Sequence, residues 1–297
     1  MSTDNIAPKT AVSKAGTFKL GQLTVNRFGY GAMQLAGPGV FGPPRDREAG
    51  IAVLRDAVES GVNHIDTSDF YGPHITNEII REALHPYRDL VIVTKVGARR
   101  GDGGSWIMDR EEDSLVRQVH DNLRNLRVQV LDAVNMRVGG VHGPEQGQIA
   151  PHIEVMEKLQ REGLIRHIGV STVTPSQFKE ARDVAEIVSV QNHYNLAHRD
   201  DDTFIEQLAG LGVAYVPYFP LGGFTPLQSV TLNAVAARIG ATPMQVALAW
   251  LLQRAPNILL IPGTSSLAHL RENLGAADLE LSADVVAELD GIVAPTA

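Results

Sequence analysis

The stretch from His64 to Gly72, HIDTSDFYG, predicts a short buried strand that stops in a polar turn. Asp66 stands where the apolar run ends, and Tyr71 follows five residues later in the expected loop. The next expected strand, residues 90–95, ends at Lys95. In folds built from βα units, the carboxyl ends of the parallel strands lie on one side of the sheet. A carboxylate, a phenol and an ammonium are therefore expected to lie together there.

The remainder of the chain alternates short apolar runs with helical patterns, which favours a parallel α/β sheet. Eight strands close a (β/α)8 TIM barrel. An open doubly wound sheet would instead carry a GxGxxG turn after an early strand, and Gly29-Tyr30-Gly31 lacks the third glycine. We therefore expect a barrel, preceded by a β-hairpin over residues 17–26. Its eight strands are expected near residues 28–33, 62–66, 90–95, 130–136, 166–170, 187–191, 213–218 and 258–261.

Helical patterns follow most of these strands. Asp109 is expected to be the N-cap of one helix, with Glu111 and Glu112 in its first turn. Two helices near the end follow each other without a strand between them. The expected helices cover residues 47–60, 77–84, 109–126, 151–162, 175–185, 201–210, 229–239, 243–254, 267–276 and 283–292.

Composition narrows the classes of function. The net charge of −8 argues against a nucleic-acid surface, which needs a basic excess. The absence of cysteine excludes thiol chemistry and fits a cytoplasmic protein. No apolar run is long enough to span a membrane, and the polar residues 1–15 are expected to be a flexible tail rather than a signal peptide. Residues 16–297 are expected to be one barrel domain, whose oligomeric state stays open.

The trio of Asp66, Tyr71 and Lys95 suits proton delivery. A tyrosine with its ordinary pKa of about 10 is a weak acid, and a nearby ammonium lowers that pKa. A buried ammonium in turn needs a carboxylate partner. Such a chain can donate a proton to a carbonyl oxygen as hydride reaches the carbon. Two alternatives stay open, namely an ion pair with a packing tyrosine and an aldolase with Lys95 as the Schiff-base nucleophile.

Several motifs together resemble the aldo-keto reductases over roughly residues 17–293. They are DTSDFYG at 66–72, TK at 94–95, IGVS at 168–171, VQNHYN at 190–195, YFPLGG at 218–223 and IPGTSSLAHLRENL at 261–274. The resemblance implies a (β/α)8 barrel that reduces aldehydes or ketones with a nicotinamide cofactor, usually NADPH, held without a Rossmann domain. It also implies that Asp66, Tyr71 and Lys95 are three members of the catalytic tetrad, with Tyr71 as the general acid.

The fourth tetrad member departs from the family, because Arg137 stands where relatives carry a histidine. Arginine can also donate hydrogen bonds to a carbonyl oxygen, and it is permanently cationic. Two alternatives stay open. Arg137 could only pair with a loop carboxylate, or His142 could take the place of the family histidine. VNMR and GTSS resemble a branch similar to the pyridoxal reductases, whose aldehyde lies beside a phenolic oxygen that Arg137 could pair with. If the missing histidine instead means lost chemistry, the chain would be a non-catalytic cofactor-sensing subunit.

The resemblance also implies a cofactor site. Ser171 and Gln191 match the partners of the nicotinamide carboxamide, with Thr172 in place of the usual asparagine, and Tyr218 matches the residue that stacks on the ring. Other residues expected to contact the nicotinamide or the pyrophosphate are Gly31, Met33, Leu221 and Gly222.

A second group is expected at the adenosine end of the cofactor. Gly263, Thr264 and Ser265 precede a helix, and helix N-termini bind phosphate. His269, Glu272 and Asn273 share one face of that helix. Because relatives carry lysine and arginine where Gly263 and His269 stand, NADH remains a candidate beside NADPH. Two further expectations concern the loop after Lys95. Trp106 lines the substrate pocket or only packs, and Arg99 and Arg100 are solvated.

Overall fold

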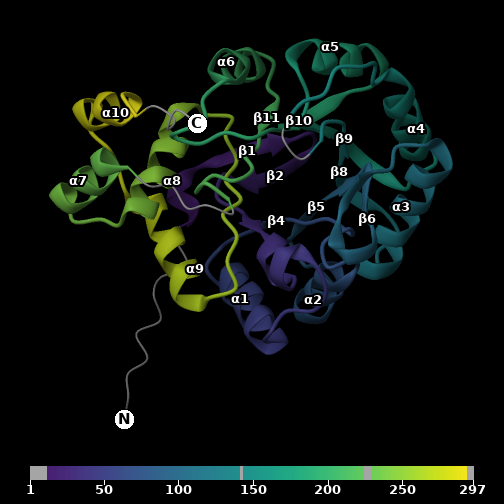
Figure 1. Ribbon diagram of the computed structural model, residues 1–297, viewed down its shortest axis with the longest axis horizontal. Helices are drawn as coiled ribbons and strands as arrows, with labels where there is room; N and C mark the ends of the chain where they lie inside the picture. Colours follow the sequence, from purple (N-terminus) through teal and green to yellow (C-terminus); the bar gives the residue numbers. More distant parts are fainter. Residues whose placement is uncertain (1–11, 141–142, 224–228, 293–297) are drawn as a thin grey trace.

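The computed structural model describes residues 12–140, 143–223 and 229–292. Seven parallel strands form one curved sheet in the order β11-β10-β9-β8-β5-β4-β3 (Figure 1). Their bounds are β3 (Tyr30–Gly31), β4 (His64–Asp66), β5 (Val91–Val96), β8 (Leu131–Arg137), β9 (Ile165–Ser171), β10 (Ile187–Gln191) and β11 (Ala214–Tyr215).

The segment around residues 258–260 closes this sheet into a barrel. Phe28 forms a parallel bridge with Leu260, and Tyr215 forms another with Ile258, so this segment joins the two outer strands. The backbone N–H of Gly29 donates to the carbonyl of Leu260 over 2.8 Å. Pro262 follows and brings no N–H group, which limits the length of this eighth strand. The predicted (β/α)8 barrel is thus confirmed, with its eighth strand held by single bridges instead of a continuous ladder.

The helices surround the strands, and Figure 1 shows α1 to α6 following one another around the outside. The first six are α1 (Arg47–Glu59), α2 (Ile75–Leu84), α3 (Glu112–Leu126), α4 (Ala150–Arg161), α5 (Pro175–Val184) and α6 (Asp202–Gly210). The last four are α7 (Val230–Ile239), α8 (Pro243–Arg254), α9 (Leu267–Leu274) and α10 (Ala283–Asp290). α7 and α8 follow each other directly, as predicted.

Two of these helices begin with the same local signal, Thr-Pro-x-Gln. In α5 the hydroxyl of Thr174 accepts from the backbone N–H of Gln177, whose side chain accepts from the N–H of Thr174. Thr242 and Gln245 repeat this capping box at α8. Each box satisfies two N–H groups that a helix start leaves free, and proline suits the first helical position. These two starts follow from local sequence chemistry.

One predicted helix start is wrong. Asp109 was expected to be the N-cap, but α3 begins at Glu112 with Glu111 in that position. Asp109 instead continues the antiparallel hairpin of β6 (Ala98–Arg100) and β7 (Trp106–Met108), where its N–H donates to the carbonyl of Gly97 over 3.0 Å. Its carboxylate lies 3.5 Å from both Arg99 and Arg117. A tertiary contact thus outweighs the capping preference.

The N-terminal hairpin covers the amino end of the barrel. β1 (Thr17–Leu20) pairs antiparallel with β2 (Leu23–Asn26), as predicted. Leu20 and Val25 are buried against Val93 and other apolar side chains of the barrel interior. Because this end is covered, the carboxyl ends of the strands form the accessible side.

Part of the predicted tail is ordered. Residues 1–11 lie outside the described residues, but Val12–Ala15 form a short 3-10 helix. Val12 is completely buried, and the guanidinium of Arg27 donates to the carbonyl of Ala15 over 3.3 Å. Burial of these two apolar side chains against the core explains why they do not belong to a flexible tail.

No single helix in the described part of the chain is long and apolar enough to cross a membrane. α7 and α8 meet the criterion only as a pair bent by 93°. Most of α8 is buried inside the fold, including Trp250, which explains its apolar character. Among the same residues, no group of three or more histidine, aspartate or glutamate side chains could hold a metal ion.

Candidate active site

The polar residues predicted from the strand ends do lie at the carboxyl ends of neighbouring strands. Asp66 ends β4, Arg137 ends β8, Ser171 ends β9 and Gln191 ends β10. The register places Arg137 beside Ser171, and Ser171 beside Gln191. Lys95 lies one residue before the end of β5. Because alternate residues of a barrel strand face the interior, these side chains converge on one mouth of the barrel.

Asp66 and Lys95 form a buried ion pair, with 2.5 Å between Lys95 Nζ and Asp66 Oδ1. Only 4% of Asp66 and 3% of Lys95 is exposed, so solvent screens this pair little. Lys95 also donates to the carbonyl of Thr67 over 2.9 Å. Burial is the largest influence and by itself would lower the pKa of Lys95, but the interactions with Asp66 and Tyr71 together outweigh it and the pKa is raised. Lys95 is therefore an ammonium at neutral pH.

Gln191 completes the environment of Asp66, a contact that sequence reasoning missed. Its Nε2 donates to Asp66 Oδ2 over 2.8 Å, so each carboxylate oxygen has a donor. No local signal predicts this contact, because the two residues lie 125 positions apart in the chain.

Tyr71 is buried beside this pair, and Lys95 Nζ lies 5.3 Å from the centre of its ring. Burial raises the pKa of Tyr71 and outweighs the lowering by Lys95, so the net shift is upward. Lys95 does lower this pKa, as expected, but desolvation of the phenolate raises it by more. Tyr71 is thus a neutral phenol that retains its proton at neutral pH.

Arg137 is partly buried at the same mouth of the barrel. Its Nη2 donates to the carbonyl of Gly140 over 2.6 Å. In the part of the chain that the structure describes, Arg137 thus binds a backbone group and not the loop carboxylate that was the alternative. Its charge lowers the pKa of both Tyr71 and Tyr218, although burial leaves both pKa values raised. Its Nε is buried without a partner among the described residues. His142 lies outside the described residues.

One cleft of about 110 Å³ is lined both by predicted catalytic residues and by residues predicted to bind the cofactor. Asp66 and Tyr71 line it together with six residues predicted to bind the cofactor: Gly31, Met33, Gln191, Tyr218, Leu221 and Gly263. Gly222 turns the chain beside this cleft with a φ of 95°, which favours glycine. Four other lining residues belong to motifs of the resemblance but were assigned no contact there: Phe219, Pro220, Ile261 and Pro262. Gln34 lines the cleft without any sequence signal.

Tyr218 has one ring face against a protein side chain. It stacks on His193 with 5.5 Å between ring centres and 10° between the planes. Burial raises the pKa of its phenol, and interactions with Arg137 and with the Thr172 side chain partly offset this rise. Because Tyr218 lines the cleft, its other face is the one available to a flat ring. This geometry fits the predicted stacking on a nicotinamide.

Thr172 holds an unusual backbone conformation next to Ser171. Its φ of 60° is left-handed, which is rare for a β-branched residue and tends to mark functional sites. Its N–H donates to the carbonyl of Gln191, and its own carbonyl accepts from Gly139, each over 2.9 Å. The hydroxyls of Ser171 and Thr172 lie 3.3 Å apart. Two hydroxyls are thus held close together where β9 ends.

Gly31 and Gly263 have a structural reason to be glycine in addition to any cofactor contact. A Cβ added at Gly31 would lie 2.4 Å from the carbonyl oxygen of Ile261, and one at Gly263 would lie 2.5 Å from that of Gly31. Real Cβ atoms do not approach so closely, so both glycines are required where the barrel closes.

The residues predicted for the adenosine end lie along the start of α9. Ser266 is its N-cap and accepts from the N–H of His269 over 3.4 Å. Thr264 is buried and its carbonyl accepts from Tyr30, whereas Ser265 and His269 are exposed. On the same helix, Asn273 is buried and Glu272 is partly buried. Arg271 forms an ion pair with Asp56 of α1 instead.

Trp106 belongs to an apolar cluster that contains Tyr71. Its ring meets Phe70 edge-on with 5.6 Å between centres, and Phe70 meets Tyr71 in the same manner at 5.4 Å. Trp106 therefore supports the wall beside Tyr71 through Phe70. Arg100 stacks over Trp106 at 4.0 Å, so the prediction that Arg100 is solvated was wrong.

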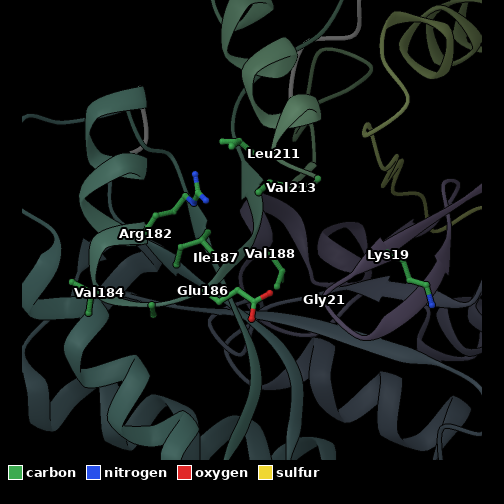
Figure 2. A pocket seen from close by; sticks show the side chains of 11 residues that line it. Lys19, Gly21, Arg182, Val184, Glu186, Ile187, Val188, Leu211 and Val213 are labelled. Carbon is green, nitrogen blue, oxygen red and sulfur yellow. The ribbon is translucent and has the colours of Figure 1, made fainter.

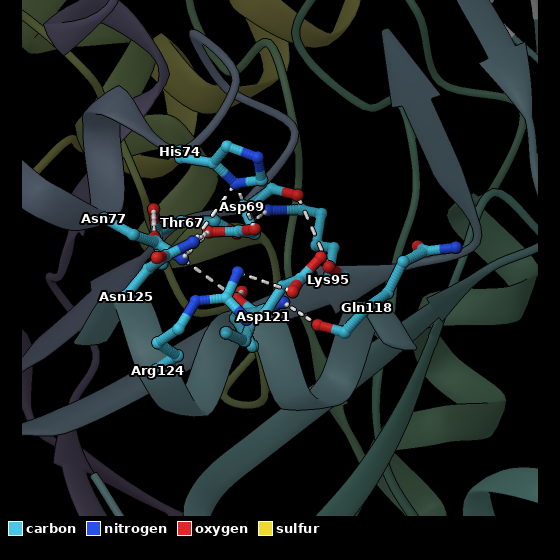
Figure 3. Close-up of polar contacts among 12 residues, drawn as sticks. Thr67, Asp69, His74, Asn77, Lys95, Gln118, Asp121, Arg124 and Asn125 are labelled. Atoms are coloured by element: carbon cyan, nitrogen blue, oxygen red, sulfur yellow. Dashed lines mark hydrogen bonds and ion pairs between the residues drawn. The ribbon is translucent and has the colours of Figure 1, made fainter. Parts of the chain in front are cut away.

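A buried polar cluster lies behind the loop that carries Tyr71 (Figure 3). Asp69 accepts hydrogen bonds from Asn77 of α2 over 3.0 Å and from Asn125 of α3 over 2.8 Å. Its other oxygen lies 2.6 Å from Nδ1 of His74. Thr67 donates to Asn77 over 2.8 Å. Both ends of this loop are thus tied to the surrounding helices.

A larger opening lies away from these residues. A pocket of about 500 Å³ is lined by Lys19, Gly21 and Ile187, among others. Figure 2 shows these residues from close by. Ile187 begins β10 and Gly21 is the turn of the hairpin, so this pocket lies at the amino end of the barrel. No residue predicted to be catalytic lines it.

The family model described as the aldo/keto reductase family matches residues 27–294. The chain belongs to the aldo/keto reductase family. Pyridoxine 4-dehydrogenase of Escherichia coli (strain K12) is 66% identical to this aldo/keto reductase over 281 residues, which are 94% of this chain and 98% of that protein. An uncharacterized oxidoreductase of Schizosaccharomyces pombe is 39% identical and covers 98% of this chain and 94% of its own length.

Solved aldo/keto reductases share the fold. A thermostable member crystallised with the inhibitor epalrestat superposes with a TM-score of 0.78 at 30% identity, over 92% of this chain and 98% of that one. A member from Klebsiella pneumoniae, crystallised with NADP and acetate, gives a TM-score of 0.73 at 25% identity, over 90% and 91% of the two chains. This aldo/keto reductase is thus an oxidoreductase of a family that uses nicotinamide cofactors.

Proposed function

We propose that this aldo/keto reductase reduces the aldehyde of a pyridoxal-type substrate with NADPH, and that Tyr71 donates the proton. The observation that carries the proposal is the neutral phenol of Tyr71 lining the cleft beside the buried Asp66–Lys95 pair. The 66% identity to a pyridoxine 4-dehydrogenase supports the substrate class, because a dehydrogenase working in reverse is a carbonyl reductase.

When bound, the cofactor supplies the hydride that reaches the carbonyl carbon. Tyr71 gives its proton to the carbonyl oxygen, which becomes the hydroxyl of the alcohol. The phenolate left on Tyr71 is stabilised by the ammonium of Lys95. Asp66 holds Lys95, and Gln191 holds Asp66. Solvent then returns the proton to Tyr71.

Arg137 would replace the family histidine as the donor to the substrate. Its guanidinium keeps N–H groups beyond the one bound to Gly140, because it carries five donors in total. A fixed positive charge near Tyr71 stabilises negative charge on a carbonyl oxygen and on a phenolic oxygen next to it. This favours an aldehyde with a neighbouring phenolate over a simple aromatic aldehyde.

Ser171, Thr172 and Gln191 would bind the carboxamide, and Tyr218 would stack on the nicotinamide ring. Thr264, Ser265 and the start of α9 would receive the 2′-phosphate of NADPH. Lysine and arginine are absent at Gly263 and His269, so this end of the site relies on hydroxyl and backbone N–H donors. Steady-state comparison of NADPH with NADH tests this part. Equal kcat/KM for both cofactors would contradict a bound 2′-phosphate.

Two alternatives receive less support. An aldolase needs an unprotonated Lys95, but Asp66 holds that lysine as an ammonium. A cofactor-sensing subunit would not need the donors that surround Asp66. Single-turnover mixing of the NADPH-bound protein with an aldehyde separates enzyme from sensor, since a sensor leaves the cofactor reduced.

The central experiment follows NADPH oxidation with pyridoxal and with benzaldehyde. We expect pyridoxal to be reduced with the higher kcat/KM, and the Tyr71→Phe variant to lose about 100-fold or more of that value, in line with loss of a general acid. Brisk reduction of benzaldehyde without any reduction of pyridoxal would remove the substrate assignment. An active Tyr71→Phe variant would remove the assigned proton donor.

A further inference from the structure

Arg100 connects two loops at the rim of the site. It ends β6, and its guanidinium is partly buried. Nη1 donates to the carbonyl of Val40 over 2.5 Å, and Nη2 donates to Gly39 over 2.9 Å and to Gly104 over 2.6 Å. Nε adds a bond of 3.2 Å to Gly104. The planar fork of one arginine thus holds carbonyls from two loops that are about 60 residues apart in the chain.

Two aromatic rings lie against the same guanidinium. Its carbon lies 4.0 Å from the ring centre of Trp106 and 5.4 Å from that of Phe41. Such contacts stabilise a cation over an aromatic face. Arg100 therefore fixes Trp106 on one side and the loop around Phe41 on the other.

Two of the groups that Arg100 binds also contact the residues on either side of Tyr71. The carbonyl of Val40, which accepts from Arg100, also accepts from the N–H of Gly72 over 3.2 Å. The N–H of Gly42 donates back to the carbonyl of Gly72 over 2.8 Å. On the other side, Trp106 packs against Phe70. The residues immediately before and after Tyr71 are therefore both held by groups that Arg100 binds.

The loop around Val40 needs such external contacts. Gly39, Val40 and Gly42 have φ values of 66°, 58° and 69°. A left-handed conformation is costly for a β-branched residue, by about 1–3 kcal/mol, and persists only when surrounding contacts hold it. Two of the carbonyls that Arg100 binds, those of Gly39 and Val40, belong to this strained turn.

We propose that Arg100 is a positioning residue that places Tyr71 for proton transfer, acting through Val40–Gly72 on one side and Trp106–Phe70 on the other. This inference rests on the proposed role of Tyr71 as proton donor. Arg100 does not line the cleft that contains Tyr218 and Gln191, so its effect should fall on carbonyl reduction and leave cofactor binding intact.

The test is a double-mutant cycle of Arg100→Met and Tyr71→Phe. Methionine keeps an apolar stem of similar length but donates no hydrogen bond. We expect Arg100→Met alone to lower kcat for aldehyde reduction by about 10-fold or more, because small misplacements of a reacting group are costly. In the Tyr71→Phe background the same change should alter kcat by less than about 2-fold, since interacting residues are not additive. The Kd of NADPH, from fluorescence titration, should stay within about 2-fold.

Arg99→Ala is the matched control. Arg99 is the neighbouring arginine of β6, its side chain is 54% exposed, and it pairs only loosely with Asp109 at 3.5 Å. We expect wild-type kcat from this variant. If Arg100→Met does not fold, Arg100→Lys keeps the charge without the fork and enters the same cycle, with a smaller loss expected.

The outcomes distinguish the positioning role of Arg100 from the role of Tyr71 as proton donor. Equal losses from Arg100→Met in both backgrounds, or a parallel loss of NADPH binding, would show a general structural role and overturn the inference. An inactive Tyr71→Phe variant beside a fully active Arg100→Met variant would overturn the inference alone. A fully active Tyr71→Phe variant would overturn the proton donor and the inference with it.

Discussion

At the scale of single residues, the environment of Tyr71 decides its chemistry. A phenol, an ammonium and a carboxylate could be expected from the strand ends, but the direction of the pKa shift could not. That direction depends on how completely the fold removes water from the ring, and burial prevails over the charge of Lys95. Burial would lower the pKa of Lys95, and this pKa is raised only because the interactions with Asp66 and Tyr71 together outweigh burial.

The raised pKa of Tyr71 predicts a pH profile. Reduction needs the protonated phenol, so kcat/KM for aldehyde reduction should stay level from about pH 6 to about pH 8 and decline only in the alkaline range. Oxidation of the corresponding alcohol needs the phenolate and should rise over that alkaline range. Steady-state profiles in both directions check this, and a reductive rate that already halves between about pH 6 and about pH 7 would contradict it.

Arg137 gives a prediction about substrate preference. In Arg137→Leu the cation near the carbonyl and phenolic oxygens is lost, so kcat/KM for pyridoxal should fall by about 10-fold or more. The loss for benzaldehyde, which has no phenolic oxygen, should be several times smaller. Parallel assays of both aldehydes measure the ratio, and an unchanged ratio would separate Arg137 from substrate selection.

At the scale of elements, the polar cluster behind the Tyr71 loop links α2 and α3. Asn77 is fully buried and donates both to Asp69 and to Asn122, while it accepts from Thr67. Asn77→Ala leaves these partners unsatisfied in the core. We expect a loss of about 2–4 kcal/mol in the free energy of unfolding.

Glu82→Ala is the control for Asn77→Ala, because Glu82 lies on the same helix and its side chain is 47% exposed in a surface pair with Arg47. Loss of an exposed ion pair should cost at most about 1 kcal/mol. Urea unfolding of both variants measures the difference. Equal costs would mean that the cluster does not hold the loop.

At the scale of the whole molecule, buried histidines set the response to acid. Burial lowers the pKa of His64 to about 4, below its ordinary value of 6.5. Above pH 6.5 the ring is neutral in both folded and unfolded chains. Between 6.5 and about 4 the unfolded chain binds a proton that the folded chain rejects, so stability is lost as pH falls through this window. The resulting loss in the free energy of unfolding is on the order of 3–4 kcal/mol at most.

His74 acts in the opposite direction, because its hydrogen bond to Asp69 raises its pKa. The stabilisation that His74 gives the folded state is complete below the pKa of the unfolded chain and is lost as pH rises through the pKa of the folded chain. Because nearly half of the His74 side chain is exposed, solvent weakens this stabilisation. We expect His64→Leu to be less sensitive than the wild type to a change from about pH 7.5 to about pH 5, measured by urea unfolding. A larger sensitivity in the variant would contradict the assigned sign.

Much of this protein could be predicted from local chemistry. Strand and helix periodicity indicated the barrel, the Thr-Pro-x-Gln boxes located two helix starts, and the polar residues at strand ends indicated the mouth of the barrel where Asp66, Tyr71 and Lys95 lie. These features depend on residues close together in the chain. The N-cap assigned to Asp109 failed because a contact with Gly97 in the β6–β7 hairpin took precedence.

The sequence by itself thus determined the order of elements and the groups available for chemistry. Only the tertiary structure decided that Gln191 donates to Asp66, that Tyr71 retains its proton, and that Arg100 is enclosed by two loops. The physical reason is that burial and long-range hydrogen bonds exist only when distant segments meet. The stretch from His64 to Gly72 contains the phenol and the carboxylate, but its environment comes from the rest of the barrel.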